Sequence, residues 1–187
     1  MEKLTRRDTN MDIKIEPIVD NNRSALKLKN EPFQIIGDLN VVKLSNKWCY
    51  NINFYAASQS TSQIFPQENY QLSEINATGF ALGAFTQTQP VGLAVFRKQP
   101  FKYLYLDDLK VNVAYRHQAI AQKLLLQACQ LAKKAKYAGI FTVCQNNNLN
   151  ACLFYLSFGF RIGGLNTKVY DHTSQSGKAD IYFYYDF

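Results

Sequence analysis

Apolar and polar residues alternate along much of the first half of the chain, the pattern of half-buried β-strands. A turn is expected at 45–47, and a hairpin turn at 87–90 joins two of the runs. Residues 56–76 are rich in Ser, Gln and Asn and predict a loop with a short helix. The predicted strands are Phe33–Gly37, Val41–Leu44, Trp48–Tyr55, Gly79–Thr86, Val91–Arg97 and about Lys102–Val113.

The apolar period changes from two to about 3.6 after the last of these strands. Arg116–Tyr137 is the longest helical signal, with a buried stripe and lysines in its last turn, where cations suit the helix dipole. A second helix is expected at Asn148–Phe158. Short strands are expected on either side of it, at Ile140–Cys144, Phe160–Gly163 and Ile181–Tyr185.

This order predicts a mixed α+β fold, in which a mostly antiparallel twisted sheet carries helices on both faces. The strand–helix–strand segment requires one parallel pair, because a helix must cross over between its two strands. Residues 1–30 are polar with weak periodicity and are expected to form an N-terminal arm, ordered only where it docks. Residues 31–187 are expected to form a single domain.

Composition excludes several classes of protein. The chain has 187 residues, 47% of them hydrophobic, which is neither disordered nor fibrous. No apolar run approaches the length of a membrane span. A net charge of +7 leaves open a nucleic-acid partner, a phosphate-rich cofactor or a surplus for solubility. The sequence shows no nucleic-acid-binding signature, so charge alone supports the first of these.

The cysteines and histidines do not have metal-site spacing. None of the four cysteines forms a C-x-x-C pair, and His117 and His172 lie far apart in sequence, so no metal is expected. The N-terminus lacks the apolar stretch of a signal peptide. These features predict a cytoplasmic protein with reduced thiols, a monomer or a homodimer.

The start of the long helix has the features of an anion site. A strand ends near Val111, a short loop turns, and the helix opens with small residues at Ala119 and Ala121. Unpaired N–H groups and the helix dipole favour an anion such as a pyrophosphate, and Arg116 adds a cation at the rim. The alternative is that both alanines simply pack against the sheet.

Residues 116–121 resemble the R-x-x-G-x-G/A motif of the GNAT acyltransferase superfamily, with alanine where the family usually has glycine. The resemblance implies that acetyl-coenzyme A is bound by this loop and that its pantetheine arm lies along the strand at Leu109 and Val111. Ala119 keeps the N–H but obstructs the loop if its φ is positive. The implied loop residues are Arg116, His117, Gln118, Ala119, Ile120 and Ala121.

Residues 148–160 resemble the superfamily's N-x-x-A-x-x-x-Y-x-x-x-G-F element. The family assigns a cofactor contact to the asparagine, here Asn148. It places the tyrosine, here Tyr155, near the thioester sulfur, where it can protonate the leaving thiolate. The two residues are two helical turns apart and share a face. The alternative for Tyr155 is a core aromatic residue with a satisfied hydroxyl.

Further segments look like the streptothricin acetyltransferases, a bacterial resistance branch of GNAT that acetylates an amine on a β-lysine side chain. They are 31–37, Trp48, 105–111, 147–152 and 160–163. An enzyme that acetylates a protein or peptide N-terminus would use the same cofactor half and differ only at residues 45–76 and 164–180, which are expected to wall the substrate site.

Two carboxylates end a strand beside the proposed thioester site. Asp107 and Asp108 point to opposite faces on a regular strand, so at most one faces the substrate unless a bulge moves either. Such a carboxylate could take the proton of the amine or bind its ammonium form. An ordinary pair of acids at the end of a strand is the competing interpretation. His117, in the phosphate loop, lies on the wrong side of the cofactor to be the base.

The sequence thus predicts an acetyl-CoA-dependent N-acetyltransferase acting on a primary amine of a small molecule by direct transfer in a ternary complex. A streptothricin-type antibiotic is one candidate acceptor. The predicted catalytic residues are Tyr155, Asp107 and Asp108. Alternatives are a protein or peptide N-acetyltransferase, and a non-catalytic module that senses acyl-CoA or binds nucleic acid.

Overall fold

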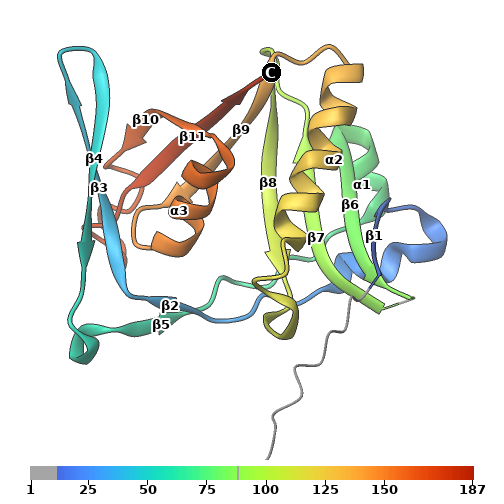
Figure 1. The fold of residues 1–187 in the computed structure, drawn as a ribbon, viewed down its shortest axis with the longest axis horizontal. Helices are drawn as coiled ribbons and strands as arrows, with labels where there is room; N and C mark the ends of the chain where they lie inside the picture. Colours follow the sequence, from blue (N-terminus) through green and yellow to red (C-terminus); the bar gives the residue numbers. More distant parts are fainter. Residues whose placement is uncertain (1–11, 88) are drawn as a thin grey trace, which may run out of the picture.

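A seven-stranded twisted sheet forms the centre of the computed structural model, which describes residues 12–87 and 89–187 (Figure 1). Every neighbouring pair of strands is antiparallel except β8 and β9, which are parallel and are joined by the crossover helix α2. The predicted parallel pair is therefore confirmed. In spatial order the strands are β1 (Ile13–Pro17), β6 (Gly79–Thr86), β7 (Gln89–Arg97), β8 (Tyr103–Val111), β9 (Gly139–Gln145), β11 (Asp180–Asp186) and β10 (Arg161–Asn166).

Helices cover both faces of the sheet, as predicted. On one face, α2 (Ile120–Lys134) and α3 (Leu149–Phe158) enclose the larger core with the inward side chains of β6 to β9 and β11. On the other, α1 (Leu72–Thr78) and the 3₁₀ helix η1 (Asp20–Lys27) close a smaller core over β6 and β7. The fold class expected from the sequence is thus confirmed.

The N-terminal segment corrects the prediction of an arm ending at residue 30. Within the described part, β1 pairs with β6 at the edge of the sheet, and Ala25 and Leu26 of η1 are buried in the smaller core. Residues 12–30 are therefore part of the domain, and residues 1–11 lie outside the described residues. Polar residues interrupt the apolar ones here, because an edge strand and a short 3₁₀ helix each bury only a few side chains.

Two small ribbons lie beside the C-terminal half of the sheet (Figure 1). β3 (Gly37–Leu44) and β4 (Lys47–Phe54) form a hairpin whose turn residues Ser45 and Asn46 both have positive φ, at the predicted turn. β2 (Phe33–Ile35) pairs with β5 (Thr61–Gln63), a short polar strand that the sequence pattern missed. Leu39 of β3 is buried against α3 and anchors the hairpin to the domain.

The long helix starts later than its apolar period predicts. The sequence places its start at Arg116, but His117 and Ala119 have φ of 62° and 59°, and α2 begins only at Ile120. A 3₁₀ turn, η3 (Val113–Tyr115), comes before residue 116, and residues 116–119 form a turn between η3 and α2. The remaining 3₁₀ turn is η2 (Ala57–Gln59). Among the described residues, no helix is long and apolar enough to cross a membrane.

Candidate active site

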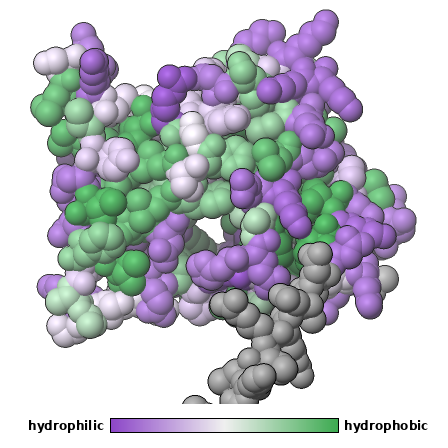
Figure 2. Space-filling model, viewed as in Figure 1, coloured by the Kyte–Doolittle hydropathy of each residue, from purple (hydrophilic) through white to green (hydrophobic). Residues whose placement is uncertain are grey.

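The central strands diverge at the middle of the sheet. β8 and β9 pair only from Tyr103–Gly139 to Leu106–Thr142. At the last pair the buried Thr142 hydroxyl donates to the Leu106 carbonyl oxygen at 2.9 Å, and beyond it neither strand has the other as a partner. Figure 2 shows a hollow at the centre of the molecule, between the half that contains α3 and the half that contains β8 and α2. We call this opening the splay.

The edge of β8 that faces the splay has the character of a free sheet edge. Leu109 and Val111 pair with Ala94 and Gly92 of β7 on one side, while no strand of the described residues pairs with them on the other. Their side chains pack partly buried against the larger core, and the free edge leaves backbone groups available to a ligand. A free edge offers N–H and C=O groups to an extended chain such as a pantetheine arm.

The loop before α2 presents backbone N–H groups at the end of β8. The first helical hydrogen bond runs from the Lys123 N–H to the Ala119 oxygen at 2.9 Å, so the N–H groups before it have no acceptor within the helix. The Ile120 side chain is buried in the core, which leaves its backbone as the part available to a ligand. Ala119 is the N-cap residue and has the left-handed conformation that its methyl group disfavours.

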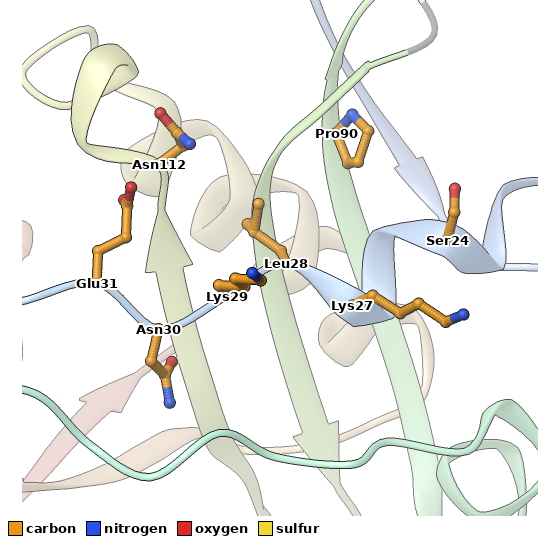
Figure 3. A pocket seen from close by; sticks show the side chains of 8 residues that line it. All are labelled: Ser24, Lys27, Leu28, Lys29, Asn30, Glu31, Pro90 and Asn112. Carbon is orange, nitrogen blue, oxygen red and sulfur yellow. The ribbon is translucent and has the colours of Figure 1, made fainter.

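The Arg116 side chain is held in place by other residues of the chain. Its Nε donates to the Val111 oxygen at 3.1 Å, and its guanidinium lies 3.8 Å from the Glu31 carboxylate. Glu31 in turn accepts a hydrogen bond from the Val113 N–H. The segment around residue 31 therefore braces the loop, as Figure 3 shows with Glu31 reaching toward Asn112.

A shallow cavity of about 350 Å³ lies beside this brace, and Figure 3 shows its lining. It is bounded by the segment after η1, the start of β7 and the end of β8. None of the predicted catalytic residues lines it, so it is a neighbour of the loop and not the splay itself. The lining residues are Ser24, Lys27, Leu28, Lys29, Asn30, Glu31, Pro90 and Asn112.

Asn148 and Tyr155 lie on α3, on the far side of the splay. Asn148 is the N-cap residue, and its side-chain oxygen accepts from the Ala151 N–H at 3.4 Å. The Tyr155 ring packs against Phe160 and Phe183 with centroid separations of 5.4 and 5.6 Å. Tyr155 thus has the core packing that was the alternative interpretation of its sequence position, and the capping role of Asn148 was not predicted.

The surroundings of Tyr155 keep its phenol in the protonated form. Burial raises the pKa of its phenol well above the ordinary value, with smaller effects from Cys144 and Asp108 and an opposing one from Thr142. Its ring lies in the larger core, on the α2 and α3 face of the sheet. The phenol stays protonated at neutral pH.

A β-bulge decides where the two carboxylates point. Val95 and Phe96 of β7 pair with Asp108 and Leu106, so Asp107 is an extra residue in β8. Leu106 and Leu109 both pack on the α2 side, which places Asp107 and Asp108 together on the opposite face. The expectation of opposite faces is therefore wrong, for the reason the sequence had left open.

Each of the two carboxylates forms an ion pair with a basic side chain of the protein. Asp107 Oδ2 lies 2.5 Å from Arg97 Nε. Asp108 Oδ2 lies 2.9 Å from Lys110 Nζ and accepts from the Tyr70 hydroxyl at 3.3 Å. Burial raises the pKa of Asp108, against the opposing effect of Lys110. Lys110 also contacts Glu68 at 2.7 Å, which ties the loop before α1 to β8.

Aromatic side chains line the face of the sheet on which these carboxylates lie. Tyr105 stacks on Phe141 at 4.8 Å, and Phe141 stacks on Tyr184 at 5.5 Å. Asp180, at the start of β11, belongs to the same face, because Ile181 and Phe183 alternate with it and are buried on the other side. The sequence analysis missed Asp180; the alternation of Asp180, Tyr182 and Tyr184 with buried residues was the available signal. We call this surface the aromatic face: Tyr103, Tyr105, Phe141, Tyr182 and Tyr184.

Metal chemistry has no candidate centre in the described ranges, where His, Cys, Asp and Glu side chains form no group of three or more that could hold an ion.

Comparison with known proteins places this geometry in a family. Residues 47–160 match the Acetyltransferase (GNAT) family. The chain is 24% identical over 159 residues to streptothricin acetyltransferase A of Bacillus subtilis, covering 84% of this chain and 91% of that protein. It is 25% identical to a streptothricin acetyltransferase of Escherichia coli, over 67% of this chain and 74% of that one.

A solved structure resembles almost the whole chain. It is a candidate streptothricin acetyltransferase of Bacillus anthracis in complex with acetyl coenzyme A, 27% identical, with a TM-score of 0.83. The match covers 95% of this chain and 99% of that one. The fold and the acetyltransferase class expected from the two sequence motifs are thereby confirmed. The family match spans more than half of the chain, both motifs and the splay between them, and the chain belongs to the GNAT family of acetyltransferases.

Proposed function

We propose that the protein transfers an acetyl group from acetyl-CoA to a primary amine of a small molecule, with a streptothricin-type antibiotic as acceptor. The observation that carries this proposal is the splay between β8 and β9, with the protonated Tyr155 phenol at its inner end. The similarity to two streptothricin acetyltransferases supports the acceptor class.

The residues around the splay fit acetyl-CoA. The N–H groups of the loop 116–121 are suited to its pyrophosphate, and the free edge of β8 at Leu109 and Val111 to its pantetheine. Asn148, at the start of α3, faces the splay from the other side. When bound, acetyl-CoA supplies an acyl thioester, which is already activated for attack by an amine.

The reaction forms a bond between the amine nitrogen and the acetyl carbon, breaks the carbon–sulfur bond and moves one proton from nitrogen to sulfur. We assign the proton for the sulfur to the Tyr155 hydroxyl, which is buried and protonated at neutral pH. The backbone N–H groups of β8 near Val111 are suited to hold the thioester carbonyl.

We assign the acceptor side of the reaction to Asp108 rather than Asp107. Asp108 is one of the charges that act on the Tyr155 phenol, and burial raises the pKa of Asp108, which favours its uptake of a proton. Because Lys110 also holds Asp108, the carboxylate is fixed in place and can receive the amine proton directly or through a water molecule. We propose the cytoplasm, the compartment that supplies acetyl-CoA, as its location.

An acetyl-transfer assay tests this function. Purified protein should release free thiol from acetyl-CoA when streptothricin is added, and mass spectrometry should show one acetyl group on the antibiotic. A panel of simple monoamines and diamines defines the acceptor range. Binding of CoA without turnover of any amine would contradict the proposal and leave the sensing module as the better reading.

A further inference from the structure

The aromatic face contains one carboxylate that differs from its neighbours in its electrostatic partners. Asp107 is paired with Arg97, and Lys110 lies between Asp108 and Glu68. Asp180 has no such cation in any ion pair formed by residues 12–87 and 89–187. A half-buried carboxylate without a cation is costly unless something else compensates it.

The surroundings of Asp180 hold its carboxylate in place. The Tyr170 hydroxyl donates to Asp180 Oδ1 at 2.8 Å, from the loop between β10 and β11. Burial raises the pKa of Asp180, and the Tyr170 hydrogen bond opposes that effect. One hydrogen bond fixes one oxygen, and the structure assigns the second oxygen no donor among the described residues.

The nearest lysine in sequence does not neutralise Asp180. Lys178 Nζ donates to Gln63 Oε1 at 2.7 Å and to Gln175 Oε1 at 2.9 Å. Gln145, the partner of Asp180 across β9 and β11, is bonded to the same two glutamines. A chain of neutral amides therefore separates the lysine from the carboxylate.

Asp180 lies on the same face of the sheet as Asp107 and Asp108, because the buried neighbours of all three pack on the opposite face. Burial raises the pKa of Tyr105 to about 12, and Asp107, Asp180 and Tyr182 add to the effect. Tyr105 is therefore close to a carboxylate on each side of β9. Tyr155 packs on Phe183 on the other face of the sheet, and Phe183 is three residues along β11 from Asp180, roughly 10 Å at the rise of a strand.

We infer that Asp180, together with Tyr105, Tyr170 and Tyr182, binds a second ammonium group of the acceptor and thereby selects diamines over monoamines. The inference rests on the proposed function and adds to it the residue that recognises the second positive charge of the acceptor. The amine that reacts must be neutral, so a carboxylate without a cation is suited to a different amine of the same molecule. Aromatic rings beside it favour a cation as well.

The test compares 1,5-diaminopentane with 1-aminopentane, which differ by one amine. The affinity of each is measured by titration calorimetry with CoA-saturated protein, and kcat/KM is measured with acetyl-CoA. The variant is Asp180→Asn, which keeps an oxygen for Tyr170 and removes the charge. The matched control is Asp171→Asn, because Asp171 lies in the loop that leads to β11 but pairs with Lys168 at the surface.

The wild type and the control should favour the diamine by about 10- to 100-fold, the range for a hydrogen bond to a charged group. Asp180→Asn should bring the ratio close to one, with the KM for acetyl-CoA unchanged. A wild type with no preference, or an Asp180→Asn variant that keeps it, overturns the inference even if amines are acetylated. Selective diamine binding that depends on Asp180 but gives no acetylated product supports the inference and contradicts the proposed transfer.

Discussion

Single residues decide whether the two motifs can act as a site. Ala119 stands at a left-handed position where its side chain is strained, whereas Gly159, at a φ of 109°, ends α3 without such a cost. Both positions belong to the motifs recognised in the sequence, and only one has the residue that its backbone favours. The cofactor loop is therefore formed in spite of its N-cap residue.

Replacing Ala119 with glycine should relieve this strain. A left-handed alanine costs about 1–2 kcal/mol, and glycine loses about 0.5–1 kcal/mol more backbone entropy on folding. We expect Ala119→Gly to raise the free energy of unfolding by about 0.5–1 kcal/mol. Urea denaturation followed by circular dichroism measures the change.

Ala121→Gly is the matched control, since Ala121 lies two residues further on, inside α2. That variant should lose about 1 kcal/mol, the usual cost of glycine in a helix. Equal losses in the two variants would show that the conformation of Ala119 carries no strain.

The two aspartates show that the direction of a side chain can depend on strand pairing that the local sequence does not reveal. The sequence placed Asp107 and Asp108 beside the site, but their faces depend on a bulge set by pairing with β7. Their cations, Arg97 and Lys110, also come from packing. Asp180 was missed because the motifs do not include β11, and its separation from Lys178 depends on glutamines distant in sequence.

At the scale of elements, the strong periodic signals predicted the helices and strands that build the site. β8, α2, β9 and α3 appear in the predicted order, because each buries a continuous apolar stripe. β1 and β5 were missed because edge strands bury few side chains and carry polar residues. The pattern of apolar and polar residues does not indicate the splay, because the splay is where strand pairing stops.

Asn148 has a role in an element and a proposed role in the site, because it caps α3 at the edge of the splay. Asn148→Ala should lower the free energy of unfolding by about 1 kcal/mol, the usual cost of losing an N-cap. Asn148→Ser keeps a capping oxygen and should retain most of that stability. If the amide contacts the cofactor, both variants should bind acetyl-CoA more weakly in titration calorimetry. Normal affinity in Asn148→Ser would limit Asn148 to capping.

At the scale of the whole molecule, the sheet consists of two halves joined by four parallel residue pairs between β8 and β9. The hollow beyond those pairs is open to a ligand that contacts both halves (Figure 2). The net charge of +7 is compatible with a polyphosphate cofactor, while the internal pairing of Arg116 with Glu31 limits how much of that charge reaches it.

A ligand in the splay should therefore stabilise the fold as a unit. Acetyl-CoA at 100 times its Kd adds about 2.7 kcal/mol, which corresponds to a rise in Tm of about 5–10 °C for a chain of this size. Differential scanning fluorimetry measures it, with pantetheine alone as the control that lacks the phosphates. A Tm that is unchanged at saturating acetyl-CoA would contradict binding in the splay.

The role of Tyr155 is the central claim at this site, and removal of its hydroxyl tests it most directly. The matched control is Tyr185→Phe, because Tyr185 packs on the same Phe160 ring, at 5.4 Å. The measurement is kcat and the KM for acetyl-CoA from thiol release with an accepted amine, between pH 6 and 9. Tyr155→Phe should lower kcat by about 100-fold, the usual contribution of a general acid, with the KM for acetyl-CoA unchanged.

Burial raises the Tyr155 pKa, so the phenol keeps its proton up to about pH 10. The wild-type rate should therefore rise with pH as the amine loses its proton, with no decline at the alkaline end of the measured range. Tyr185→Phe should retain wild-type kcat. Wild-type kcat in the Tyr155→Phe variant, with the protein folded and acetyl-CoA bound, would contradict the assignment of Tyr155 as the acid.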